Sequence, residues 1–315
     1  MQHKRSPALD SQIEPVQGVT RDGQPISYNR APAPDLEPYV GRFYVTKVDM
    51  PADYTLSCGL LNDVSCVRIQ LAGDWAAETA DGPLTARREA MFFGPQRRKM
   101  PISVTGSFIS VGIHLRPGAC AALGTPLPPD TLDRIRPTDA STVDPEAIIA
   151  ALTPDGSPED WITTIEDHLR KAVARAGGKL PDPVTVAFEE LAFVNPTMTV
   201  AEAAERCGVE RRKLERVIAR DFGLSPKKVL RRARALDMAS HLRGVADEAE
   251  GEAIVLRYYD ESHLIREFTE LFGMSPRHFV ATPQPIMTLA LESRQAHRLE
   301  ALKRLQPGES RPWER

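Results

Sequence analysis

The sequence predicts an α+β protein of two domains: a β-rich N-terminal domain of the sandwich or small-barrel type that ends in helices, and an all-α C-terminal domain. Three observations support this fold class. At 315 residues the chain is longer than one hydrophobic core usually supports. Short apolar runs separated by turn residues extend to about residue 118, where helical spacing replaces them. One phrase of five residues, Phe-Gly-x-Ser-Pro, occurs twice in the second half.

Residues 1–35 are polar and rich in proline, so we predict a mostly disordered tail. The positive charges at the start precede no apolar segment, which is unlike a secretory signal, and no apolar run is long enough to span a membrane. The four cysteines lack the spacing of a metal site and are typical of buried thiols in a reducing compartment. We therefore expect a cytoplasmic protein without a metal or other cofactor. The cysteines are Cys58, Cys66, Cys120 and Cys207.

Residues 36–180 are predicted to form the β-rich domain. The runs VGRFYV, CVRIQLA, EAMFFG and FISVGIHL have strand length and are bounded by turn residues. A capping box with proline in the first turn opens at Ser157, and apolar residues then recur every fourth position until Gly177-Gly178. This helix, 159–176, carries Trp161, Ile165 and Leu169, which either contact a second protomer or pack on the β-domain. The stretch 177–183 is the expected linker.

From residue 183 the pattern is helical. A second capping box opens at Thr199, Gly208 follows the short helix, and a new helix covers 210–222. A short helix, a glycine turn and a second helix form the helix-turn-helix arrangement. FGLSP at 222–226 recurs as FGMSP at 272–276, so a second unit is expected 50 residues further on. Glycine ends each recognition helix, Ser-Pro starts the next helix, and the helix 226–243 joins the units.

Basic charge is concentrated in the first unit. Residues 205–245 hold twelve Lys and Arg against five Asp and Glu, although the whole chain has a net charge of −3. A local excess of this kind is typical of phosphate binding, whereas the alternative is a solvated helix face. Arginine can grip guanine, and glutamate can accept from cytosine. The candidate DNA contacts are Arg211, Arg212, Glu215, Arg216 and Arg220 on the helix, with Lys227, Lys228, Arg231, Arg232 and Arg234 at phosphates.

The stretch YYDESHLIREFTELFGMSPRHF (258–279) resembles the DNA-binding domain of the AraC/XylS family of transcription regulators. The resemblance implies an AraC-type domain over 183–285, followed by a helical or flexible extension at 286–315. It also implies that Glu261, Ser262 and Arg266 face the groove, with His263 near the backbone. The sequence departs from the family at Glu210, a poor N-cap for the first recognition helix. In the second unit Arg257 replaces a turn glycine and the acidic segment VADEAEGEA precedes it, so we expect this unit to read DNA weakly or mainly to supply shape.

YVGRFYV, GPQRRKM and VGIHLRPGACAALG resemble the β-rich, cupin-like domain that a subset of these regulators carries. The resemblance implies a sensing or dimerising role. A metal cupin needs a His-x-His pair, which does not occur, so His114 is interpreted as a structural histidine. An enzyme with a vestigial DNA module is a rival that would need a catalytic constellation absent from the sequence. A second rival is a domain that binds only another protein.

Arginines gather near strand ends in this domain, and converging guanidinium groups could bind an anion such as a carboxylate or a nucleotide second messenger. The alternative is ordinary solvated loop charge. The candidate effector residues are Arg87, Arg88, Arg97, Arg98 and Arg116. The sequence thus predicts a sequence-specific transcription regulator that binds double-stranded DNA, forms a homodimer, contacts RNA polymerase and is not an enzyme.

Overall fold

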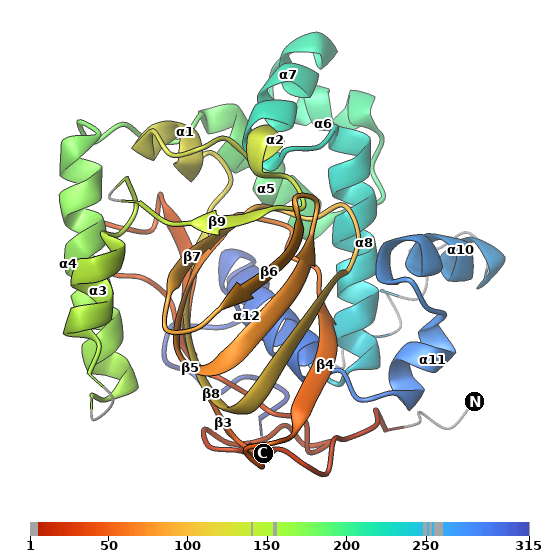
Figure 1. The fold of residues 1–315 in the computed structure, drawn as a ribbon. Helices are drawn as coiled ribbons and strands as arrows, with labels where there is room; N and C mark the ends of the chain where they lie inside the picture. The colour runs from red at the N-terminus through yellow and green to blue at the C-terminus, as the bar shows by residue number, and fades with distance from the viewer. Residues whose placement is uncertain are drawn as a thin grey trace.

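The computed structural model describes residues 6–139, 141–153, 156–247, 251, 254 and 261–314. Its N-terminal part is one curved antiparallel sheet in the order β1-β3-β8-β5-β7-β9, with β2 on β3, β4 on β8 and β6 on β5 (Figure 1). Register shifts within β5, beside β8, let these long strands bend. The strands are β1 Glu14–Pro15, β2 Tyr28–Arg30, β3 Val40–Asp49, β4 Thr55–Leu60, β5 Cys66–Thr79, β6 Gly82–Ala86, β7 Ala90–Phe93, β8 Met100–Leu115 and β9 Ile135–Pro137.

One face of the central strands is apolar and is covered by helices. Phe43, Val67 and Ile113 are fully buried there, in one cluster with residues of α3 (Pro145–Ala151) and α4 (Pro158–Arg175). The cluster includes the three apolar residues of α4 that the sequence offered for dimer contacts, Trp161, Ile165 and Leu169. Of the two interpretations, packing on the β-domain is the one observed, because these side chains are at most 2% exposed within a single chain.

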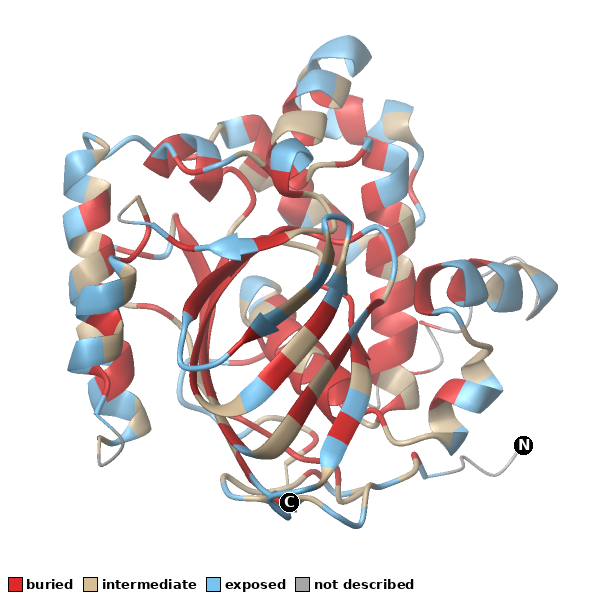
Figure 2. Cartoon of the chain, in the orientation of Figure 1, coloured by how far each residue is buried: buried red, intermediate tan, exposed pale blue. Residues whose placement is uncertain are grey.

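The opposite face of the same strands is polar, yet it is also buried. In the sheet register, Gly112 of β8 is paired with Tyr44 of β3 on one side and with Arg68 of β5 on the other. Two residues along β8 on the same face, Ser110 is paired with Thr46. The helix α12 (Pro285–Ala301) packs against β3 and β4 on one side and α8 on the other (Figure 1). It is buried along most of its length (Figure 2), so it lies between the sheet and the all-α region.

The all-α region has the expected repeat. Its helices are α5 Pro183–Val194, α6 Val200–Arg206, α7 Arg211–Phe222, α8 Pro226–Leu242, α10 Glu261–Phe272 and α11 Pro276–Ala281, and the small helices α1 Ala119–Leu123 and α2 Pro128–Thr131 precede them. Gly223 and Gly273 end α7 and α10 with φ of 72° and 69°, the left-handed conformation that favours glycine. The repeated Phe-Gly-x-Ser-Pro phrase therefore has the same backbone function in both units.

The prediction of a disordered tail is wrong for residues 6–35. Two short strands there pair with β3. Gln24 is 1% exposed, and its side-chain amide donates to the carbonyl oxygens of Pro7 and Ala8. At the other end, 286–315 was expected to be helical or flexible. Its helical part is α12, and beyond it Trp313 is buried and donates a hydrogen bond of 3.2 Å to Glu292. No helix among the described residues is long and apolar enough to cross a membrane.

Candidate nucleic-acid interface

The first helix-turn-helix unit is built from α6 and α7. Thr199 caps α6 through a reciprocal box with Glu202, as the sequence predicted, and Gly208 turns the chain with φ of 65°. Leu214, Val217 and other apolar residues of α7 are buried against α5, α6 and α8. These contacts fix α7 so that its opposite side is left to solvent.

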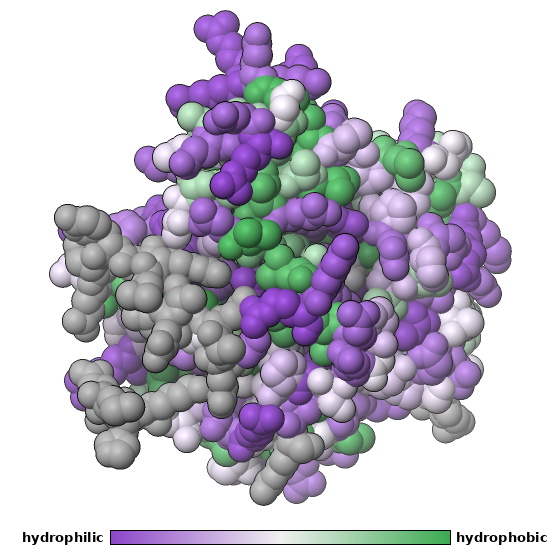
Figure 3. Space-filling view, turned by 180° about the vertical axis from the view of Figure 1, so that it is seen from behind, coloured by the Kyte–Doolittle hydropathy of each residue, from purple (hydrophilic) through white to green (hydrophobic). Residues whose placement is uncertain are grey.

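The exposed side of α7 is basic. Arg212 and Arg216 lie one turn apart, are exposed, and have no ion-pair partner among the described residues. Arg211 is also exposed and pairs with Glu215 at 2.9 Å on the same helix. In Figure 1 the beginning of α7 projects at the top of the molecule, and Figure 3 shows hydrophilic side chains projecting there from behind. This end of α7 is accessible to a duplex.

Arg220, the last predicted contact on α7, points elsewhere. Its guanidinium donates to both carboxylate oxygens of Asp221 at 2.7 Å and to Asp182, the N-cap of α5, at 3.3 Å. Arg220 thus ties the end of α7 to the start of α5, and the sequence could not show this because Asp182 lies 38 residues away. The geometry assigns it a structural role.

The basic start of α8 divides into two groups. Lys227 and Lys228 are exposed, as a phosphate contact requires. Arg231 instead donates to Glu267 and to both carboxylate oxygens of Glu270 in α10.

The remaining two arginines of α8 also point inward. Arg234 donates to Glu267 at 2.6 Å, and Arg232 is 1% exposed. The expectation that these two arginines contact phosphates is wrong in this structure, because the buried guanidinium of Arg232 donates to backbone carbonyl oxygens and that of Arg234 donates to Glu267.

The second unit presents a less basic surface. On α10, Ser262 and Arg266 are exposed, Ile265 is 40% exposed, and His263 lies 3.8 Å from Glu267. The helix is held by its aromatic residues, since Phe268 and Phe272 stack with ring centroids 4.2 Å apart. Asp260, Arg257 and the side chain of Glu261 lie outside the described residues. In Figure 1, α7 lies at the top of α8 and α10 lies beside the middle of α8.

The predicted effector arginines do not converge on one site. Arg87 and Arg88 are exposed in the β6–β7 turn, where Arg87 lies 3.1 Å from Asp74. Arg116 donates to Glu189 of α5 at 2.9 Å, in another part of the molecule. Arg97 and Arg98 lie in the loop before β8.

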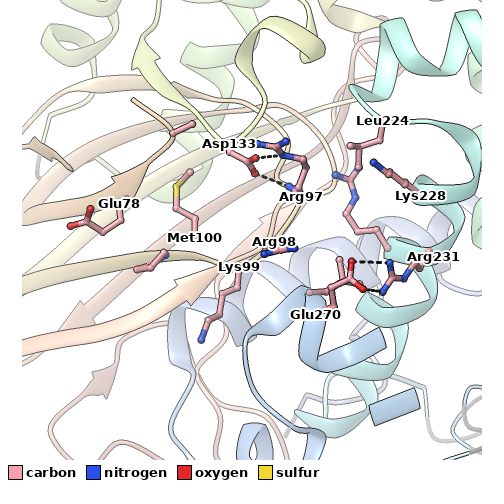
Figure 4. Close-up of a pocket in the computed structure, with 14 residues that line it drawn as sticks. Glu78, Arg97, Arg98, Lys99, Met100, Asp133, Leu224, Lys228, Arg231 and Glu270 are labelled. Atoms are coloured by element: carbon pink, nitrogen blue, oxygen red, sulfur yellow. Dashed lines mark hydrogen bonds and ion pairs between the residues drawn. The ribbon is translucent and has the colours of Figure 1, made fainter. Parts of the chain in front are cut away.

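That loop forms one wall of a pocket between the two domains, with a volume of about 500 Å³. Leu224 and the basic residues of α8 form the opposite wall (Figure 4). Six basic residues line this interdomain pocket, namely Arg97, Arg98, Lys99, Lys228, Arg231 and Arg232, against three acidic ones, Glu78, Asp133 and Glu270. The structure thus joins residues that the sequence assigned separately to an effector and to DNA.

Two of the basic groups are neutralised within the pocket. Arg97 pairs with Asp133 and Arg231 with Glu270, as the dashed lines in Figure 4 show. Arg98, Lys99 and Lys228 have no ion-pair partner among the residues that the structure describes. Burial also lowers the pKa of Lys99. The pocket lining nevertheless has more basic than acidic residues, and both domains contribute basic residues.

No group of His, Cys, Asp or Glu among the described residues has the geometry of a metal site. His114 lies on β8 with its ring against Tyr44, with centroids 5.2 Å apart. Burial, with the nearby Arg68 charge, lowers the pKa of His114 to about 3, so its ring is neutral at physiological pH.

The helical repeat and the exposed arginines of α7 define a DNA-binding protein of the helix-turn-helix class. A family model described as a helix-turn-helix domain matches residues 190–282, and one described as a domain of unknown function matches residues 28–133. The chain carries the AraC-type DNA-binding domain, so the resemblance to AraC/XylS regulators is confirmed. No curated protein matches the chain.

Solved structures that match the chain include ToxT from Vibrio cholerae with a bound unsaturated fatty acid. It is 10% identical over 76% of this chain and 94% of that chain, with a TM-score of 0.45. ToxT bound to (E)-4-(8-methylnaphthalen-1-yl)but-3-enoic acid is 10% identical over 76% and 98%, with a TM-score of 0.46. The AraC-like transcriptional activator CuxR is 13% identical over 72% and 88%, with a TM-score of 0.29.

Proposed function

We propose that the protein is a sequence-specific transcription regulator that reads DNA chiefly through α7. The observation that carries this proposal is the pair Arg212 and Arg216, exposed one turn apart on a helix whose other side is locked into the core. An arginine in the major groove can donate two hydrogen bonds to guanine. Glu215, between them, can accept from cytosine once it leaves Arg211.

Phosphate contacts would come from residues that flank this helix. Arg211, Lys227 and Lys228 are exposed and would position the duplex without selecting a sequence. The second unit would contribute Ser262 and Arg266, with Ile265 against a thymine methyl group and His263 near the backbone. Only Arg266 among these carries a permanent charge, which supports the expectation that the second unit binds more weakly.

A titration of promoter fragments at increasing salt concentration tests the proposal. Phosphate contacts release counterions, so the affinity should fall steeply as the salt concentration rises. A flat salt response, or equal affinity for all fragments, would overturn the proposal. Arg88→Ala serves as a control, since it removes an exposed charge from the β-domain and should leave the affinity unchanged.

We further propose that an anionic effector binds in the interdomain pocket. Its volume of about 500 Å³ lies within the range of small-molecule sites, and it is lined by three cations that have no ion-pair partner within the described part of the chain. The ligand class is a carboxylate or a phosphate-bearing nucleotide. Such a ligand would contact the loop before β8 and α8 together, so its binding would bias the arrangement of the two domains.

Calorimetry with citrate, a long-chain fatty acid and a cyclic dinucleotide tests this site. Binding of one probe should be lost in Arg98→Ala and in Lys228→Ala, and retained in Arg88→Ala and Arg116→Ala, which lie outside the pocket. Binding that persists in both pocket variants would place the effector elsewhere. The homodimer and the RNA polymerase contact also stay predictions, and the apolar face of α4 is not available for them.

A further inference from the structure

Arg68 on β5 is a buried cation without a counter-ion. It is 4% exposed, and no carboxylate lies within ion-pair distance of it among the described residues. Its guanidinium lies over the rings of Tyr44 and Phe93, 5.6 and 5.2 Å from their centroids. Aromatic faces compensate only part of the cost of burying a charge, and buried arginines are normally paired. The Nε–H of Arg68 has no hydrogen-bond acceptor.

Two hydroxyl groups beside Arg68 are also unsatisfied. The sheet register places Tyr44 and Arg68 on either side of Gly112, whose missing side chain leaves room for the Tyr44 ring. Ser110 is on the same face of β8, one row away. The hydroxyl oxygens of Tyr44 and Ser110 are buried without a hydrogen-bond partner. Each such group costs free energy unless something in the cavity satisfies it.

These three residues line one small cavity. Its volume is about 20 Å³, and Ile286, Leu289 and Ala290 of α12 close it from above. A volume of this size holds about one particle as large as a water molecule. Larger organic anions are excluded as long as α12 stays in place.

We propose that this cavity, the Arg68 cavity, binds a monovalent anion of halide size, and that chloride is its physiological occupant. The donors are a guanidinium and two hydroxyl groups, whose residues all line the cavity and whose unpartnered atoms can donate to an anion. An anion neutralises the buried guanidinium, whereas a water molecule would satisfy hydrogen bonds and leave the charge uncompensated. The charge therefore selects an anion over water.

The site also has a consequence for the domain arrangement. Because α12 forms the roof and packs on α8, a bound halide would stabilise the docked position of α12. The site is separate from the interdomain pocket and does not depend on the proposed effector.

Crystals of the full-length protein grown with sodium bromide provide the direct test. An anomalous peak between Arg68, Tyr44 and Ser110 is expected. The bromide concentration should be well above the one that would fill the site. Electron density in the cavity without an anomalous signal would then identify water and overturn the proposal.

Thermal unfolding in solution gives a second readout. At constant ionic strength, replacing gluconate by chloride should raise Tm of the wild type in a saturable way, because gluconate is too large for the cavity. Tyr44→Phe removes one donor to the anion and should weaken chloride binding about tenfold or more. Arg68→Met should abolish the response.

Arg88→Ala is the matched control, since it removes an exposed arginine outside both the cavity and the interdomain pocket and should respond like the wild type. An equal chloride response in the wild type and Tyr44→Phe would overturn the proposal, even if Arg68→Met failed to fold.

Discussion

Arg232 of α8 donates a hydrogen bond of 2.8 Å to the backbone carbonyl oxygen of Gln96, in the loop before β8. A second bond of 2.6 Å reaches the carbonyl oxygen of Asp63. Burial lowers the pKa of Arg232 to about 10, which leaves it charged at neutral pH. A residue from the most basic stretch of the chain thus joins the two domains.

Arg232→Ala should lower the free energy of unfolding by about 2–4 kcal/mol, because two buried carbonyl oxygens lose their donor and a cavity is left. Chemical denaturation measures this change. Lys227→Ala, which removes an exposed charge from the same helix, should change stability by less than about 0.5 kcal/mol. A similar stability for both variants would contradict the inward role of Arg232.

Arg216→Ala should reduce discrimination between the preferred site and single-base variants by about 1–3 kcal/mol. Lys227→Ala should weaken binding to all sequences alike and reduce the salt dependence, because it removes only a phosphate contact. Competition binding with a randomised operator library measures both effects. If Arg216→Ala weakened every sequence equally, α7 would not be reading bases.

The two repeat glycines offer a matched comparison. Both have positive φ, so alanine should cost about 1–2 kcal/mol at either position. At Gly273 an added Cβ meets open space, whereas at Gly223 it would lie 3.1 Å from the carbonyl oxygen of Pro128 in α2. Gly223→Ala should therefore destabilise the protein more than Gly273→Ala in a denaturant titration. Equal costs would show that α2 gives way easily.

His114 should make stability depend on pH. Its pKa is about 3 in the folded protein, below the ordinary value of about 6.5 expected in the unfolded chain. The unfolded chain thus binds more protons, and stability is lost as the pH falls from about 6.5 towards 3, by at most about 1.4 kcal/mol per pH unit. Denaturation at several pH values should show a shallower decline in His114→Gln. An identical slope would exclude His114 as the cause.

Glu270→Gln should increase the affinity of the interdomain pocket for an anionic probe. The hydrogen bond from Arg231 lowers the pKa of Glu270, so the carboxylate is charged and competes with the probe for that guanidinium. The pair is partly exposed, so we expect an increase of roughly twofold to fivefold, measured by calorimetry. A decrease would show that Glu270 helps to hold the ligand.

Local features of the fold were accessible from the sequence. The capping boxes at Ser157 and Thr199 depend on residues three positions apart, and both form as predicted. The glycines that end α7 and α10 were recognised because only a few residue types adopt positive φ readily. The strand runs also appear in β3, β5, β7 and β8. Signals of this kind are carried by neighbouring residues.

Long-range contacts were not accessible in the same way. Nothing near Arg232 indicates that its partner lies 136 residues earlier, and its neighbour Lys228 in the same helix is exposed. The alternation of polar residues in β3 and β8 does not reveal that this face is buried, because the helix that buries it begins 170 residues after the end of β8. The sequence shows that these strands have polar residues at alternate positions. Whether that polar face is buried depends on tertiary packing.

The position of α12 also changes how this protein can be divided for experiments. The linker at 177–183 looks like a natural place to cut, but the helix that seals the polar side of the β-sheet lies beyond it. Its Arg294 pairs with Asp63 of the β-domain at 2.7 Å and with Asp237 of α8 at 2.8 Å. A fragment that ends at the linker would lack α12, the helix that covers the polar face of its sheet. A fragment that begins at the linker would expose the sheet-facing side of α12 to solvent and would tend to aggregate. Expressing both pieces together should restore a soluble complex through fragment complementation.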